Sequence, residues 1–184
     1  MLYHPSLFLT QLVVGLALLL AHLWALSAGE SLVTPLKKFP RSRGWGVTLL
    51  TIAAAWSLWL MMTMDLGEFT SKRPILIALV PIAYVLTLFF VEEFLAIRAL
   101  GMVLLLVSCV VLDAAYLSAD PARLPLVALA YFWIGEALFC VGKPYLLRDV
   151  IGWMTEKTGR LKLASFAGIA FGILLIGIAV ARFR

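Results

Sequence analysis

The stretch SLFLTQLVVGLALLLAHLWALSA, residues 6–28, contains no aspartate, glutamate, lysine or arginine. An α-helix rises about 1.5 Å per residue, and about 20 apolar residues cross the hydrocarbon core of a bilayer, so this run is long enough to span one. No lysine or arginine precedes it, and the residues around Ala28 do not form a small-residue cleavage site. We therefore expect an uncleaved first membrane helix, not a secretory signal.

Five further apolar runs follow the first one. They cover residues 44–64, 74–91, 99–118, 124–142 and 164–183. Hydrophobic residues make up 64% of the 184 residues and charged residues 14%, whereas about 25% of a soluble domain is charged. The sequence predicts an all-α integral membrane protein, a compact bundle of six transmembrane helices. We expect one transmembrane domain over residues 1–184, with no room for a soluble catalytic domain.

The connection between the last two runs has the pattern of a short amphipathic helix lying in the membrane plane, at about residues 144–157. Pro144 suits the first turn of this helix, and Gly159 is expected to end it. Apolar residues recur at helical spacing and form one stripe: Leu147, Val150, Ile151 and Met154. Trp153 also belongs to this interfacial helix. We expect a connector at the lipid interface, with a gate or a docking surface for a partner as the alternative.

Basic residues are unevenly distributed between the two ends of the expected helices. Residues 29–43 are expected to form a basic loop broken by Pro35 and Pro40. Ten of the 15 lysines and arginines lie after the first, third and fifth helices: Lys37, Lys38, Arg41, Arg43, Arg98, Lys143, Arg148, Lys157, Arg160 and Lys162. The other five are Lys72, Arg73, Arg123, Arg182 and Arg184. The positive-inside rule predicts that both termini are outside, an N-out, C-out topology.

The short loops and the lack of a transit peptide favour a bacterial cytoplasmic (inner) membrane. The net charge of +5 is expected to serve anchoring to anionic membrane lipids, and a bound lipid is expected. The sequence has no basic patch interleaved with aromatic residues, so we do not expect a nucleic-acid partner.

Small residues at four-residue spacing mark two candidate helix-packing faces. These are Ala17, Ala21 and Ala25 in the first helix, and Ala164, Gly168 and Gly172 in the sixth. Small side chains let two helices approach closely in a membrane. Whether these faces pack inside one chain, between copies of it, or against another subunit stays open, as does a threefold repeat of helical hairpins.

Ionisable residues at membrane depth are the candidate functional residues, because each is costly unless it is paired or hydrated. They are Glu136, Glu92, Glu93, Arg98, Lys143, Asp113 and His22. All but Asp113 and His22 are expected to form one polar cluster in the cytoplasmic half. This cluster would serve either as a proton or cation pathway or as ion pairs that pin helices together.

Cofactor and catalytic motifs are absent from the sequence. His22 could bind an inter-subunit haem or quinone, although a hydrogen-bonded packing histidine is the simpler interpretation. Cys109 and Cys140 are isolated, so neither a disulfide nor a metal site is indicated. We find no nucleophile motif, no metal-ligand spacing and no phosphate-binding glycine loop, and predict no catalytic residues.

Three function classes remain. The first expectation is a non-catalytic membrane subunit or assembly partner of a larger complex, which binds other membrane subunits or itself. The alternative is a small oligomeric channel or transporter that uses its buried acids. The third is a membrane enzyme acting on a lipid or a quinone.

Overall fold

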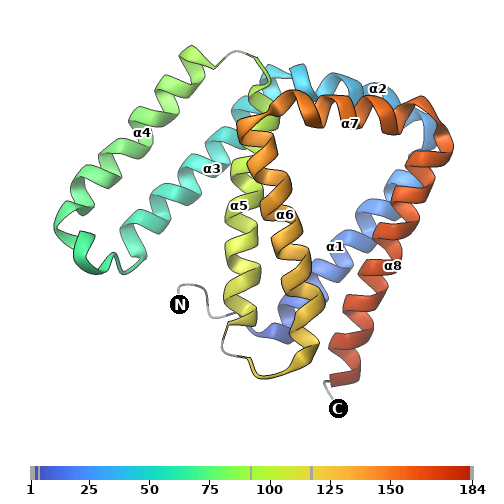
Figure 1. The fold of residues 1–184 in the computed structure, drawn as a ribbon. Coiled ribbons are helices and arrows are strands. Elements are labelled where there is room, and N and C mark those ends of the chain that lie inside the picture. The colour runs from blue at the N-terminus through green and yellow to red at the C-terminus, as the bar shows by residue number, and fades with distance from the viewer. Residues whose placement is uncertain (1–2, 4, 92, 117, 183–184) are drawn as a thin grey trace.

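The computed structural model describes residue 3 and residues 5–91, 93–116 and 118–182 (Figure 1). It is 91% helical, and the described residues contain no strand. The α-helices are α1 Leu7–Ala28, α2 Val33–Lys38, α3 Arg43–Thr63, α4 Arg73–Phe90, α5 Leu95–Ala115, α6 Leu124–Gly142, α7 Pro144–Glu156 and α8 Thr158–Arg182. Six of the described helices are long and apolar enough to cross a membrane, which agrees with the predicted number.

Two predicted helix boundaries differ from the structure by more than three residues. Helix α5 begins at Leu95 instead of 99, and α8 begins at Thr158 instead of 164. Both helices start with a turn that carries arginine or lysine, so hydropathy detects only their apolar parts. The prediction that Gly159 ends the preceding helix was wrong, because α7 ends at Glu156 and Gly159 lies in the first turn of α8.

The predicted loop 29–43 is largely helical. Helix α2 is flanked by the 3-10 segments Gly29–Leu32 and Phe39–Arg41, and Figure 1 shows it running beside α7 across one end of the long helices. Pro35 lies in the first turn of α2, where a missing amide hydrogen breaks no helical hydrogen bond. The two short helices α2 and α7 define one end of the molecule, here called the α7 end. Helix α1 begins and α8 ends in the opposite half (Figure 1).

The long helices form three pairs, α1 with α8, α5 with α6, and α3 with α4, and α3 also packs on α5. The helices within each hairpin that closes at the α7 end make few contacts with each other, so the close pairs do not coincide with these hairpins. Instead of a compact bundle, the pairs are splayed (Figure 1). One core cluster joins Val111, Leu126, Ala130 and Leu175, and a second joins Leu50, Leu95 and Ala99.

Helices α1 and α8 approach each other closely at Gly15 and Gly172. A Cβ atom placed on Gly15 would lie 2.9 Å from the carbonyl oxygen of Gly172, and one placed on Gly172 would lie 2.8 Å from the carbonyl oxygen of Gly15. Gly172 belongs to the packing face predicted on α8, of which Ala164 and Gly168 are half-buried. On α1 Ala17 and Ala21 are exposed and Ala25 is half-buried, and the residue that meets Gly172 is Gly15. The face that meets α8 carries Gly15 because the absence of a side chain allows closer contact than alanine does.

Candidate functional site

A tight turn joins α4 to α5 at the α7 end. Phe94 has a positive φ of 56°, a left-handed conformation that is rare for a bulky residue. Its carbonyl oxygen accepts hydrogen bonds from the amides of Ile97 and Arg98, both at 3.1 Å. Strained residues of this kind persist only where the surrounding structure holds them, and they cluster at functional sites. The turn is therefore the starting point for the candidate site.

Arginines from different segments surround this turn. Arg41, Glu93, Phe94 and Arg148 line a polar pocket of about 420 Å³. The guanidinium carbon of Arg148 lies 5.6 Å from the centre of the Phe94 ring, within range of a cation–π contact. Arg148 also forms an ion pair with its neighbour Asp149, at 2.7 Å.

Arg98 lines an adjoining pocket of about 380 Å³, together with Glu93 and the end of α4. Its Nε atom is buried and has no hydrogen-bond partner in the described part of the chain. An unsatisfied buried donor costs about 1–3 kcal/mol, and more when the group is charged. The structure thus brings together two members of the predicted polar cluster, Glu93 and Arg98, and leaves a charged donor of Arg98 without a partner.

An apolar cavity of about 360 Å³, here called the slot, lies between α3, α4 and α5. The slot is lined by small and aliphatic side chains and by a few hydroxyls. Among them are Leu50, Ala54, Ser57, Tyr84, Met102 and Leu105. Arg98, Met102 and Leu105 follow each other at helical spacing, so Arg98 stands one turn above the slot on the same side of α5.

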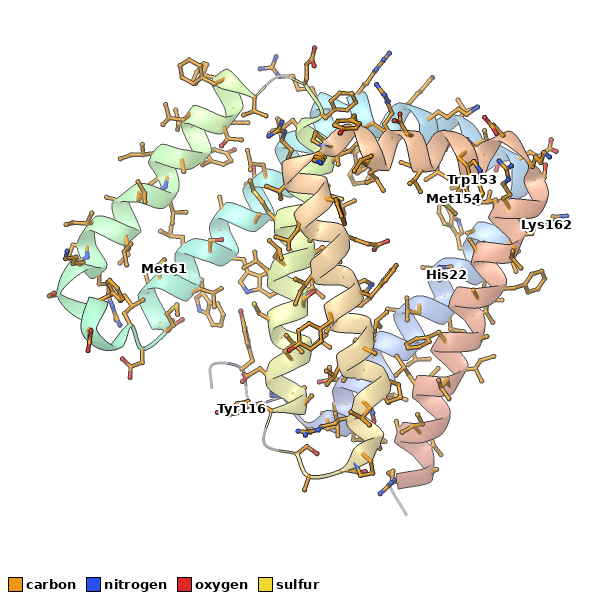
Figure 2. The ribbon with its side chains drawn as sticks, in the orientation of Figure 1. His22, Met61, Tyr116, Trp153, Met154 and Lys162 are labelled. Carbon is orange, nitrogen blue, oxygen red and sulfur yellow. The ribbon has the colours of Figure 1, made fainter. Side chains whose placement is uncertain are left out.

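A second cavity, of about 380 Å³, follows the same helices toward the opposite end and is lined in part by Cys109, Leu112 and Tyr116. Asp113 lies here and accepts a hydrogen bond of 2.9 Å from the amide of Tyr3. The Tyr3 hydroxyl in turn accepts one of 2.6 Å from Trp56 Nε1. Figure 2 shows Tyr116 at this lower end of α5. Asp113 thus fastens the chain before α1 to α5, far from the α7 end.

Of the other members of the predicted cluster, Glu136 and Lys143 do not join Glu93 and Arg98. Glu136 and Lys143 are exposed on α6 and at its end, and neither lines the two arginine pockets. Glu92 lies outside the described residues. The predicted stripe on α7 is half-buried at Leu147, Ile151 and Met154 and exposed at Val150. Trp153, on the same helix, is also exposed.

His22 lies between α1 and α8 (Figure 2). Its Nδ1 is 2.7 Å from the carbonyl oxygen of Leu18, one turn earlier. The far edge of the ring, with Nε2, packs against Gly168, so closely that a side chain on that glycine would collide with it. This geometry makes His22 part of the α1–α8 packing. No group of three potential metal ligands occurs among the residues that the structure describes.

Sequence reasoning missed three features of the site. Tyr84 and the slot depend on how α4 tilts against α3 and α5, and no local pattern reports that angle. The left-handed Phe94 has no sequence signal either, because asparagine or glycine is the usual residue there. Arg41 and Arg148 were assigned to basic connections without being brought together.

No protein-family model, no curated protein and no solved structure matches this chain.

Proposed function

We propose that this chain is a non-catalytic membrane subunit that assembles with another membrane protein through α6. The observation that carries the proposal is Glu136. It is exposed, it lies about 9 Å from the end of α6 at Gly142, and no hydrogen bond or ion pair to another described residue accompanies it. A carboxylate facing lipid is costly, so such a residue marks a contact with something polar.

The surroundings of Glu136 suggest a helix as the partner. Phe132 and Phe139 lie four residues before it and three after it, on the same side of α6, and are 61% and 58% exposed. The buried side of α6, with Ala130 and Ala137, is turned to α5. Two aromatic rings around one acceptor fit a partner helix that carries a hydrogen-bond donor such as serine, asparagine or lysine.

The first test is Glu136→Leu. Interhelical hydrogen bonds in membranes contribute about 1–2 kcal/mol, so loss of the acceptor should weaken assembly about fivefold to thirtyfold. Native mass spectrometry of protein extracted from its own membrane in mild detergent measures the fraction that retains its partner. Leu138→Ala, at an exposed site two residues away, is the control and should leave that fraction unchanged. Equal partner retention in Glu136→Leu and the wild type would contradict the proposal.

The same glutamate also fits the alternative of a small oligomeric channel. In such a channel several copies would turn the side of α6 that carries Phe132, Glu136 and Phe139 toward a common axis. Glu136→Gln distinguishes the two functions. It preserves hydrogen bonding but removes the charge, so a subunit should stay assembled. A channel should lose ion flux in reconstituted vesicles without unfolding, and native mass spectrometry should show a homo-oligomer.

We further propose the N-out, C-out orientation in a bacterial cytoplasmic membrane. The basic residues counted at the α7 end support it through the positive-inside rule. In a background where Cys109 and Cys140 are replaced by serine, a membrane-impermeant thiol reagent added to intact cells should label Ala119→Cys, in the α5–α6 connection, and spare Lys162→Cys. Labelling of Lys162→Cys alone would show the inverted orientation.

A further inference from the structure

The α4–α5 turn joins a charged donor without a partner to an apolar slot, and this combination is the chemistry of a lipid site. We propose that the slot holds one acyl chain of an anionic phospholipid whose phosphate binds Arg98. The site is separate from Glu136 and its neighbours on α6, so this proposal does not depend on the proposed function.

The polar end of the site is formed by Arg98. Arg98 lines the pocket beside the end of α4, and its Nε has no hydrogen-bond partner in the described part of the chain. A guanidinium binds two phosphate oxygens with a matching planar geometry, and such charge-assisted hydrogen bonds are the strong ones. The exposed rings of Phe89 and Phe90, at the end of α4, line the same pocket and provide an apolar rim at the membrane interface.

The local charge favours an anionic headgroup over a zwitterionic one. Glu93 lines both arginine pockets, but Arg98 stands on one side of it and Arg41 and Arg148 on the other. Asp149 neutralises Arg148 in part. The described residues that line the two pockets, together with Asp149, comprise three arginines and two acids, so their net charge is positive.

The apolar end of the site is the slot itself. Helix α4 packs on α3 but scarcely contacts α5, so the slot is bounded by α3 and α5 and opens beside α4. Two of the three hydroxyls in its described lining have partners: Tyr84 is 2.9 Å from Thr51 Oγ1, and Thr87 donates to the Ala83 carbonyl at 2.7 Å. Apart from Ser57 the rest of the lining is apolar, and apolar cavities stay dry, so a lipid chain is the occupant that a bilayer supplies. The volume of about 360 Å³ lies within the usual range of ligand pockets.

The test uses the full chain purified in neutral detergent and offered phosphatidylglycerol or phosphatidylcholine, with bound lipid counted by native mass spectrometry. We expect phosphatidylglycerol to be retained and Arg98→Ala to lower its retention about tenfold. Ala54→Phe should fill the slot and lower retention of the same lipid. Arg98→Gln is a second variant that removes the charge but keeps a polar side chain, and it should lower retention as Arg98→Ala does. Helical circular dichroism checks that each variant is folded.

Two matched controls accompany these variants. Ala55→Phe makes the same change one residue along α3, at an exposed alanine that does not line the slot. Lys162→Ala removes a positive charge at the far corner between α7 and α8 (Figure 2). Equal retention of the two lipids by the wild type, or an unchanged Arg98→Ala, would overturn the proposal. Sensitivity to Arg98→Ala but not to Ala54→Phe, or displacement by inorganic phosphate alone, would show a surface phosphate site and overturn the slot.

Discussion

Gly172→Ala is expected to separate α1 from α8. The new methyl group would lie 2.8 Å from the Gly15 carbonyl oxygen and 3.0 Å from the Leu19 amide nitrogen, closer than ordinary van der Waals contact. Both atoms belong to the backbone of α1, so no side chain can rotate to make room, and the helices themselves must move apart. The close approach at this crossing stabilises the pair, because van der Waals contact between small residues, and not a hydrophobic driving force, holds helices together in lipid.

The expected loss is about 1–3 kcal/mol of unfolding free energy, the usual cost of overpacking a well-packed contact. Reversible unfolding of the purified protein in mixed detergent measures it. Gly177→Ala is the control on the same helix, because no atom lies within 4 Å of its added Cβ. That variant should be neutral, or gain up to about 1 kcal/mol from the higher helix propensity of alanine. Equal unfolding free energies for Gly172→Ala and Gly177→Ala would contradict the expectation that the close approach at Gly172 stabilises the protein.

The sequence predicts the six long helices well because each needs only length and apolarity, which are local properties. It predicts the packing faces less well. Ala17, Ala21 and Ala25 have a suitable spacing, but a four-residue stripe of small residues shows only that close approach is possible. Gly15, on a neighbouring stripe, meets α8 instead. The rotation of α1 about its axis is decided by which stripe fits Gly172, and that is a property of two helices.

The same limit explains the polar cluster. Sequence position fixes the depth of Glu136, Glu93 and Arg98 in the membrane, but not the direction in which each residue faces. The direction of α6 is fixed by its contact with α5, where a Cβ atom on Gly101 would lie 2.8 Å from the Ala137 carbonyl oxygen. That contact turns Ala137 inward and leaves Glu136 exposed to one side. Residues at similar depth are therefore not necessarily neighbours.

The helical character of residues 29–41 was missed for a different reason. Pro35 and Pro40 were interpreted as helix breakers, yet both occur in first turns, of α2 and of the 3-10 segment Phe39–Arg41. Proline in a first turn starts a helix as readily as proline elsewhere ends one. Pro40 is also fully buried, and its segment packs on α5 beside the arginine pockets. The missed helix is thus the element that brings Arg41 to the site.

Leu175→Ala is expected to release the α1–α8 pair from α5 and α6. Leu175 is fully buried in the core cluster with Val111, Leu126 and Ala130, through which α8 reaches the α5–α6 pair. Truncation of a buried leucine costs about 2–5 kcal/mol in soluble proteins. Part of that cost in soluble proteins is the free energy of transferring the side chain out of water. Lipid is as apolar as leucine, so little of this part applies here. The unfolding free energy should fall by about 2 kcal/mol, from missing contacts and the cavity.

A control variant at the neighbouring residue, Leu174, separates the loss of the core contact from the effect of the truncation itself. Leu174→Ala makes the same truncation one residue away, where the side chain is 47% exposed, and should cost less than about 0.5 kcal/mol. Hydrogen exchange should report the release, because Gln11 of α1 donates a hydrogen bond of 2.7 Å to the Ala122 carbonyl just before α6, and residues around both should exchange faster in Leu175→Ala alone. Equal protection in the two variants would contradict the role of the leucine cluster and leave the Gln11 contact and the Arg182–Asp120 ion pair, at 3.1 Å, to hold the pairs together. The splayed arrangement makes this test decisive, since the two pairs share few other contacts along their length.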